Sequence, residues 1–150
     1  MTNKTRSTYT QILVKLKQLQ PDVNPKTILI DFELGFKGAV SEIFPNITIR
    51  GCLFHFSQCL WRKVQEVGLQ TRYSVDEVFS FEIRKLVALA FVPQIYVINA
   101  FEILLQYPYY IEHEETLQPI IDYFEDTWIG RLTRRGNRWS PKFPITMWNC

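Results

Sequence analysis

The stretch from Thr27 to His55 constrains the fold of this chain more than any other. An uninterrupted apolar run stops abruptly at Asp31, and a second short apolar run ends at Cys52. Between them, apolar residues recur at the three-and-four spacing of one helical face until Pro45. Two strands joined by a helix of this length are expected to pair in parallel, with a right-handed connection. Polar residues that follow such strands lie at one edge of the sheet, where open α/β sheets carry their chemistry.

Residues 27–30 and 47–51 are the expected strands, and residues 34–44 are the expected connecting helix. Another helix precedes them and ends at Pro21. Its apolar face is predicted from residues at helical spacing, namely Tyr9, Ile12, Leu13, Leu16 and Leu19.

No strand pattern returns after Cys52. Apolar spacing predicts helices up to Gly130, one of them opened by a capping-box signature in which Ser74 and Glu77 satisfy each other's backbone amides. Residues 131–150 have no period and are expected to form a basic, unstructured tail. The predicted core of this half is Phe79, Ile83, Leu86, Val97, Phe101, Leu104, Ile121 and Phe124.

The fold class that follows is a helix-dominated α/β protein. A partial α/β domain with two parallel strands is expected over residues 1–70, and an all-helical region with a basic C-terminal tail over residues 71–150. Two parallel strands make a poor sheet by themselves, so the chain is expected to be a fragment of a larger protein.

Composition limits the class of protein but says little about partners. An apolar content of 47% excludes disorder, and a net charge of +2 is too small to indicate a particular partner. Three cysteines and no apolar signal segment favour a reducing compartment with free or metal-bound thiols. No apolar segment is long enough to predict a membrane span.

Several residues are candidates for metal binding or catalysis. Asp31 either ends its strand at a preferred site of function or simply caps the following helix, whereas Glu33 is interpreted as a solvated acid in the first helical turn. Cys52, His55 and Cys59 fall in one stripe if the helix begins near Cys52, so they could be zinc ligands, but a fourth ligand is missing and ordinary packing is the alternative.

A dense basic cluster stands near the C-terminus. Four arginines within eight residues, with a tryptophan beside them and no acid between, are suited to phosphate contacts and to stacking on an exposed base. The alternative is a solvated loop that keeps the surface soluble. The cluster comprises Arg131, Arg134, Arg135, Arg138 and Trp139.

Five segments together resemble the Mutator-like element (MULE) transposases, in the order and at the spacing of that family. They are Asp31-Phe32-Glu33, Gly51 to Phe56, Tyr123 to Gly130, Phe143-Pro144-Ile145 and Trp148-Asn149. The Cys-x-x-His step after a strand is the most specific of them. The resemblance implies a DNA transposase whose ribonuclease H-like catalytic domain is interrupted by a helical insertion.

The resemblance also implies roles for particular residues. Asp31 corresponds to the second of three catalytic acids that hold Mg²⁺ or Mn²⁺, and Cys52 and His55 correspond to the Cys-x-x-His motif. The first and third acids of the family would fall outside residues 1–150, and one aspartate cannot hold two metal ions, so the chain alone is expected not to cut DNA. DNA with the terminal repeats of a transposon is the implied partner, and the nucleus is the implied location.

Two classes of function follow from these observations. The chain is either the middle of a metal-dependent DNA transposase or a catalytically inactive, transposon-derived module that binds DNA or protein. Self-association is an additional expectation under either reading, and no membrane partner is expected.

Overall fold

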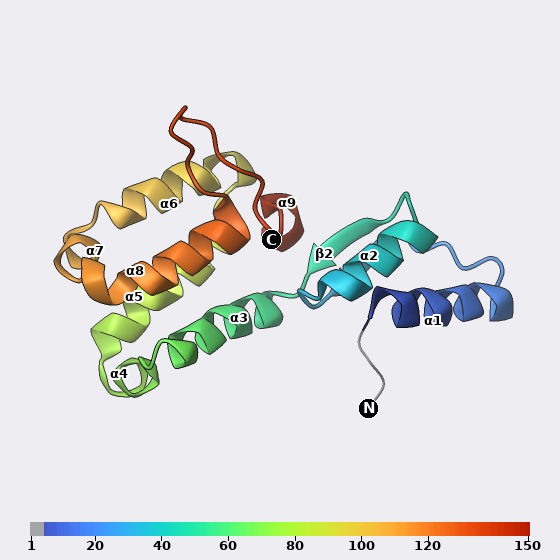
Figure 1. Ribbon diagram of the computed structural model, residues 1–150, viewed down its shortest axis with the longest axis horizontal. Helices are drawn as coiled ribbons and strands as arrows, with labels where there is room; N and C mark the ends of the chain where they lie inside the picture. The colour runs from blue at the N-terminus through green and yellow to red at the C-terminus, as the bar shows by residue number, and fades with distance from the viewer. Residues whose placement is uncertain (1–4) are drawn as a thin grey trace. The chain divides into compact units, whose positions relative to one another are not determined.

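The computed structural model describes residues 5–150, which form two compact units (Figure 1). The first unit is Met1–Cys52 and the second is Leu53–Cys150. The division falls ahead of residue 70, because the helix α3 (Leu53–Glu66) packs with later helices through Phe56, whose ring lies 4.8 Å from those of both Trp128 and Trp148. The expected domain limit between residues 70 and 71 stays a prediction.

The first unit contains the predicted strand–helix–strand arrangement. After α1 (Arg6–Leu19), the strands β1 (Thr27–Ile30) and β2 (Thr48–Gly51) pair in parallel and are connected by α2 (Leu34–Ile43). Thr27 lies opposite Thr48, and Ile30 lies opposite Gly51. Within residues 5–150 no further strand joins this sheet. The predicted parallel pair and its connecting helix are therefore confirmed.

The core of the first unit is small. Leu13 from α1 packs with Ala39, Val40 and Phe44. Partly buried apolar residues of the two strands pack against this cluster. The predicted apolar face of α1 is only partly correct, since Ile12, Leu16 and Leu19 are exposed. The physical reason is that α1 meets α2 along a strip around Tyr9 and Leu13, which is narrower than the apolar face of the helix.

In the second unit every named element is a helix. After α3 come α4 (Gln70–Val75), α5 (Glu77–Ala88), the short 3₁₀ helices η1 (Leu89–Phe91) and η2 (Gln94–Tyr96), α6 (Val97–Leu105), α7 (Pro108–Glu112), α8 (Glu114–Phe124), the π-helix η3 (Glu125–Ile129) and α9 (Ile145–Trp148). All eight residues predicted for the core of this half are buried. No helix in residues 5–150 has both the length and the apolar character that a membrane crossing requires. The structure is thus helix-dominated α/β, as expected.

The expectation of an unstructured tail after Gly130 is wrong. Phe143, Met147 and Trp148 are buried, with Phe143 stacked 5.2 Å from Trp128 and Trp148 stacked 4.8 Å from Phe56. The amide of Cys150 donates to the carbonyl of Ala90 at 2.7 Å. The segment is mostly irregular, so its buried residues follow no helical or strand period, which is the pattern on which the prediction relied.

The predicted capping box at Ser74 and Glu77 is also wrong. The helix α5 is capped by Asp76, whose carboxylate accepts from the amide of Phe79 at 2.9 Å. This hydrogen bond is the main cause that lowers the pKa of Asp76. Ser74 still belongs to α4, where its hydroxyl donates to the carbonyl of Gln70 at 2.9 Å. Asp76 is the residue with the extended backbone that an N-cap needs.

Replacing a buried aromatic residue of the second unit tests the assignment of its core. Phe101 is fully buried and stacks 5.6 Å from Phe124, so Phe101→Ala is expected to lower the free energy of unfolding by about 3–5 kcal/mol. Phe81→Ala is the matched control, because Phe81 is 56% exposed. Denaturant unfolding followed by tryptophan fluorescence reports on this unit alone, since all four tryptophans lie in it. A loss below about 1 kcal/mol for Phe101→Ala would contradict the assignment.

Candidate functional site

Asp31 lies where the sequence placed it, directly after the last residue of β1. The amide of Cys52 donates to the carbonyl of Ile30 at 2.9 Å, so the ends of both strands meet at this edge. The Asp31 side chain is partly exposed. Within residues 5–150 its carboxylate accepts no hydrogen bond and makes no ion pair. It is therefore available to a ligand at the C-terminal edge of the sheet.

Glu33, two residues later, is held inside the protein's own network. The hydroxyl of Tyr9 donates to its two carboxylate oxygens at 3.0 Å each, and the ring of Tyr9 packs edge-on against Phe36 at 5.1 Å. Burial raises the pKa of Tyr9, and the hydrogen bond and charge of Glu33 and the charge of Asp31 add to this rise. Glu33 is thus partly buried and hydrogen-bonded at the N-cap of α2, because α1 brings Tyr9 to it, so its interpretation as a solvated acid of the first helical turn is only partly correct.

Phe32 connects the two strand ends in a way that the sequence did not indicate. Its ring lies over the backbone of Gly51, so closely that a Cβ atom built on Gly51 would overlap the ring. Glycine is favoured at this position because the aromatic ring occupies the space of a side chain and would have to move to admit one. The contact between the Phe32 ring and the Gly51 backbone therefore packs the segment that carries Asp31 against the end of β2.

The three soft candidate ligands are not gathered into one cluster in the described part of the chain. His55 and Cys59 lie on α3 in the second unit, whereas Cys52 ends the first unit. The Nδ1 atom of His55 is buried without a hydrogen-bond partner, and its ring meets Phe54 edge-on at 5.4 Å. Among residues 5–150 no three histidine, cysteine, aspartate or glutamate side chains are gathered closely enough to hold a metal ion. Metal binding by Cys52, His55 and Cys59 stays a prediction.

Cys59 has a local partner instead. Burial raises the pKa of Tyr123 to about 12, and the charge of Cys59 is the next cause. The ammonium of Lys63 lies 5.7 Å from the centre of the Tyr123 ring. Cys59 therefore belongs to the contact between α3 and the helix α8, which carries Tyr123.

The basic cluster forms a short hairpin, defined here as residues 131–139. The amide of Trp139 donates to the carbonyl of Arg131 at 2.9 Å, and the amide of Thr133 donates to the carbonyl of Asn137 at 2.6 Å. Leu132 and Arg138 form an isolated antiparallel bridge. Gly136, with φ of +79°, makes the tight turn that a left-handed backbone conformation permits. The cluster is thus a structured element with a tip at residues 134–136.

The five residues of the cluster have unequal environments. Arg134, Arg135 and Trp139 are exposed, and Trp139 as a whole residue is 70% exposed. Arg131 is paired with Asp126, and the side chain of Arg138 is 13% exposed and paired with Glu102 and Glu125. Burial lowers the pKa of Arg138, but its hydrogen bonds to these two acids outweigh burial, so the pKa is raised. The sequence showed the density of arginines but not which of them are already neutralised.

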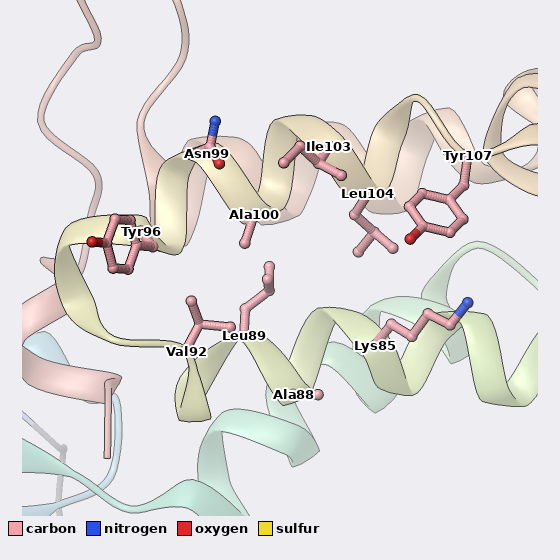
Figure 2. Close-up of a pocket in the computed structure, with 10 residues that line it drawn as sticks. All are labelled: Lys85, Ala88, Leu89, Val92, Tyr96, Asn99, Ala100, Ile103, Leu104 and Tyr107. Carbon is pink, nitrogen blue, oxygen red and sulfur yellow. The ribbon is translucent and has the colours of Figure 1, made fainter.

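The second unit also has an apolar cleft of about 390 Å³ between α5 and α6 (Figure 2). Among the described residues that line it, Lys85 is the one with a charged side chain, and that ammonium pairs with Glu82 at 2.7 Å. Leu89, Ala100 and Leu104 point into the space between the two helices in Figure 2. The residues that line the cleft include none of the predicted site residues.

The contact between Phe32 and Gly51 can be tested by a double-mutant cycle. Gly51→Ala is expected to destabilise the first unit by about 1–3 kcal/mol, because the new methyl group displaces the ring. In the background of Phe32→Ala the same substitution is expected to cost much less, since the ring is absent. Denaturant-dependent amide exchange of residues 27–51 measures both effects. Equal costs in the two backgrounds would show that Phe32 does not require the glycine.

The environment of Tyr123 predicts a dependence of stability on alkaline pH. Its pKa is about 12 in the folded protein and about 10 in an unfolded chain. The protonated form is favoured on folding, so this contribution to stability is complete below pH 10 and is lost as pH rises from about 10 to 12. Tyr123→Phe is expected to make the fall in unfolding free energy over this range shallower, by up to about 1.4 kcal/mol per pH unit.

Tyr96→Phe is the control for this titration, because Tyr96 is 58% exposed. Urea unfolding of the second unit at several pH values between 9 and 11.5 provides the measurement. An unchanged slope in Tyr123→Phe would contradict the assigned environment.

Comparison with known proteins bears on the first unit. The family model described as the MULE transposase domain matches residues 1–59. No curated protein and no solved structure matches the chain. The matched segment contains Asp31, Cys52 and His55, whereas Tyr123 to Gly130 and the hairpin lie beyond it. The predicted resemblance is thus confirmed for residues 1–59, which are similar to the MULE transposase domain.

Proposed function

We propose that this chain is part of the catalytic region of a Mutator-like DNA transposase, in which Asp31 helps to hold a divalent metal ion for phosphoryl transfer on DNA. The observation that carries the proposal is the position of Asp31, which follows a parallel strand at the edge of the sheet with its carboxylate unengaged within residues 5–150. This is the edge at which α/β proteins bind ligands. The match to the transposase domain over residues 1–59 supports it.

The chemistry of the acids favours a hard metal ion. Carboxylate oxygen is the ligand that Mg²⁺ and Mn²⁺ prefer, and such ions stabilise the attacking and leaving oxygens of a phosphoryl group. Asp31 can supply such an oxygen, whereas Glu33 is engaged by the hydroxyl of Tyr9 at 3.0 Å. In the proposed function, Tyr9 holds Glu33 away from the ion and leaves Asp31 as the ligand from this segment.

A single aspartate cannot assemble the two-metal centre of such an enzyme. The remaining acids and a complete ribonuclease H-like fold are proposed to come from other parts of the transposase. The chain alone is therefore expected to bind Mg²⁺ weakly at millimolar concentration and to leave DNA intact.

The hairpin is the proposed DNA contact. Arg134 and Arg135 project two exposed guanidinium groups from its tip, and Trp139 offers an exposed indole face for stacking on a base. We also propose that the DNA substrate carries transposon terminal repeats, that the protein acts in the nucleus and that it self-associates.

A second candidate function is a catalytically inactive, transposon-derived module that binds DNA or protein. The hairpin favours it, because the exposed basic tip lies in the second unit and depends on no catalytic acid. The two functions differ in whether Asp31 matters once the complete protein is assembled.

Substitution of the two acids in the complete transposase separates these functions. Asp31→Asn is expected to abolish Mg²⁺- or Mn²⁺-dependent cleavage of terminal-repeat DNA, because an amide is a poor ligand for the ion. Glu33→Gln is the matched control and is expected to retain most of the cleavage. DNA binding should survive in both variants and weaken steeply with salt. Cleavage by Asp31→Asn at the parental rate would reject the catalytic assignment and favour the binding module.

A further inference from the structure

We infer that Arg138 is a positioning residue, which holds the hairpin so that Arg134, Arg135 and Trp139 face the DNA, and that it does not itself contact phosphate. The inference rests on the proposed DNA contact of the hairpin. The sequence predicted that Arg138 contacts DNA. In this inference Arg138 instead acts as a clamp, which holds in place the residues that contact DNA.

The contacts of Arg138 carry this inference. Its Nη1 atom donates to Glu125 Oε1 and to the carbonyl of Gly130, both at 2.6 Å, and its Nη2 atom donates to Glu102 Oε1 at 2.8 Å. Two carboxylates therefore neutralise one guanidinium, whose side chain is 13% exposed. A DNA phosphate would have to displace both acids to reach it, whereas Arg134 and Arg135 are exposed.

These contacts connect the base of the hairpin to two elements of the second unit, α6 and η3 with its C-terminal Gly130. Glu102 belongs to α6, Glu125 begins η3, and Gly130 precedes the hairpin. Gly130 has φ of +91°, and a Cβ atom there would overlap the carbonyl of Trp139. Arg131 is fixed to Asp126 on the other arm of the hairpin. Both arms are thus held at the base.

Beyond the base, the hydrogen bonds that the described residues make in the hairpin are internal to it. The bonds between Thr133 and Asn137 and the turn bond from the Gly136 amide to the Thr133 carbonyl, at 3.0 Å, lie entirely within it. Trp139 directly follows Arg138, so fixing the backbone of Arg138 also fixes the start of the indole side chain. Without the clamp, the hairpin would have to become ordered when it binds, which weakens binding without removing a phosphate contact.

Salt dependence distinguishes a clamp from a phosphate contact. The slope of log K against log salt reports the number of neutralised phosphates, at about 0.9 per contact in duplex DNA. Arg134→Gln and Arg135→Gln are each expected to make the slope shallower by about this amount. Arg138→Met is expected to weaken binding about tenfold or more at every salt concentration with the slope unchanged, because the hairpin then has to become ordered when it binds.

A second measurement needs no DNA. Trypsin cleaves after arginine, so its rate at Arg134 and Arg135 reports how often the hairpin opens. We expect cleavage there to be several times faster in Arg138→Met and in Glu125→Gln, and intermediate in Arg138→Lys, because one ammonium group cannot bridge both acids and the carbonyl in the same planar geometry. Arg62→Met is the matched control, since Arg62 is exposed on α3, where its guanidinium donates to Gln58 at 2.9 Å.

The outcomes separate the inference from the proposed function. Arg138→Lys and Glu125→Gln keep the test valid if Arg138→Met loses the helical circular dichroism of the parent. A shallower salt slope in the Arg138 variants, with trypsin cleavage at the parental rate, would show that Arg138 contacts phosphate and would overturn the inference alone. Failure of the parent protein to bind any DNA at low salt would overturn the proposed DNA contact, and the positioning role with it.

Discussion

The parallel register of β1 and β2 is the constraint on which the first unit depends. Because Ile30 lies opposite Gly51, both strands end at one level, and the residues after them are delivered to one edge. Phe32 favours this register, since a side chain at the position of Gly51 would overlap its ring and force it to move. A slip of the register by one residue would place Arg50 or Cys52 under the ring. The position of Asp31 thus follows from a packing contact made by its neighbour.

Periodic segments were predictable because their burial follows their geometry. The strands, α2 and the core residues of the second unit were each indicated by spacing alone, and the structure buries Phe79, Leu86 and Phe124 as expected. The segment after Gly130 was not predictable in the same way. Its buried residues, such as Phe143 and Trp148, lie in irregular backbone and are recruited by aromatic partners that are distant in the sequence, including Phe56. Local spacing contains no signal for such contacts.

The candidate site shows the same division. Asp31 could be found from the sequence, because an acid that ends an apolar run is a local feature. Which arginines are already paired with acids could not be found from the sequence, because the acids that neutralise Arg138 are 36 and 13 residues away from it in the chain. The contact of Glu33 with Tyr9 spans 24 residues and was missed for the same reason. Composition identifies residues capable of an interaction, and the fold decides which of them have already made one.

The π-helix η3 has a consequence for how this segment can change over evolutionary time. Its closing hydrogen bond runs from the amide of Gly130 back to the carbonyl of Glu125 at 2.6 Å, one residue further than an α-helical bond reaches. Loss of one residue here would let the turn close as an ordinary α-helix and rotate everything after it about the helix axis by roughly 100°. Glu125 and Gly130 would then no longer converge on one guanidinium. Between Phe124 and Arg131 the number of residues is therefore constrained more strictly than their identity, so insertions and deletions should be rarer there than substitutions.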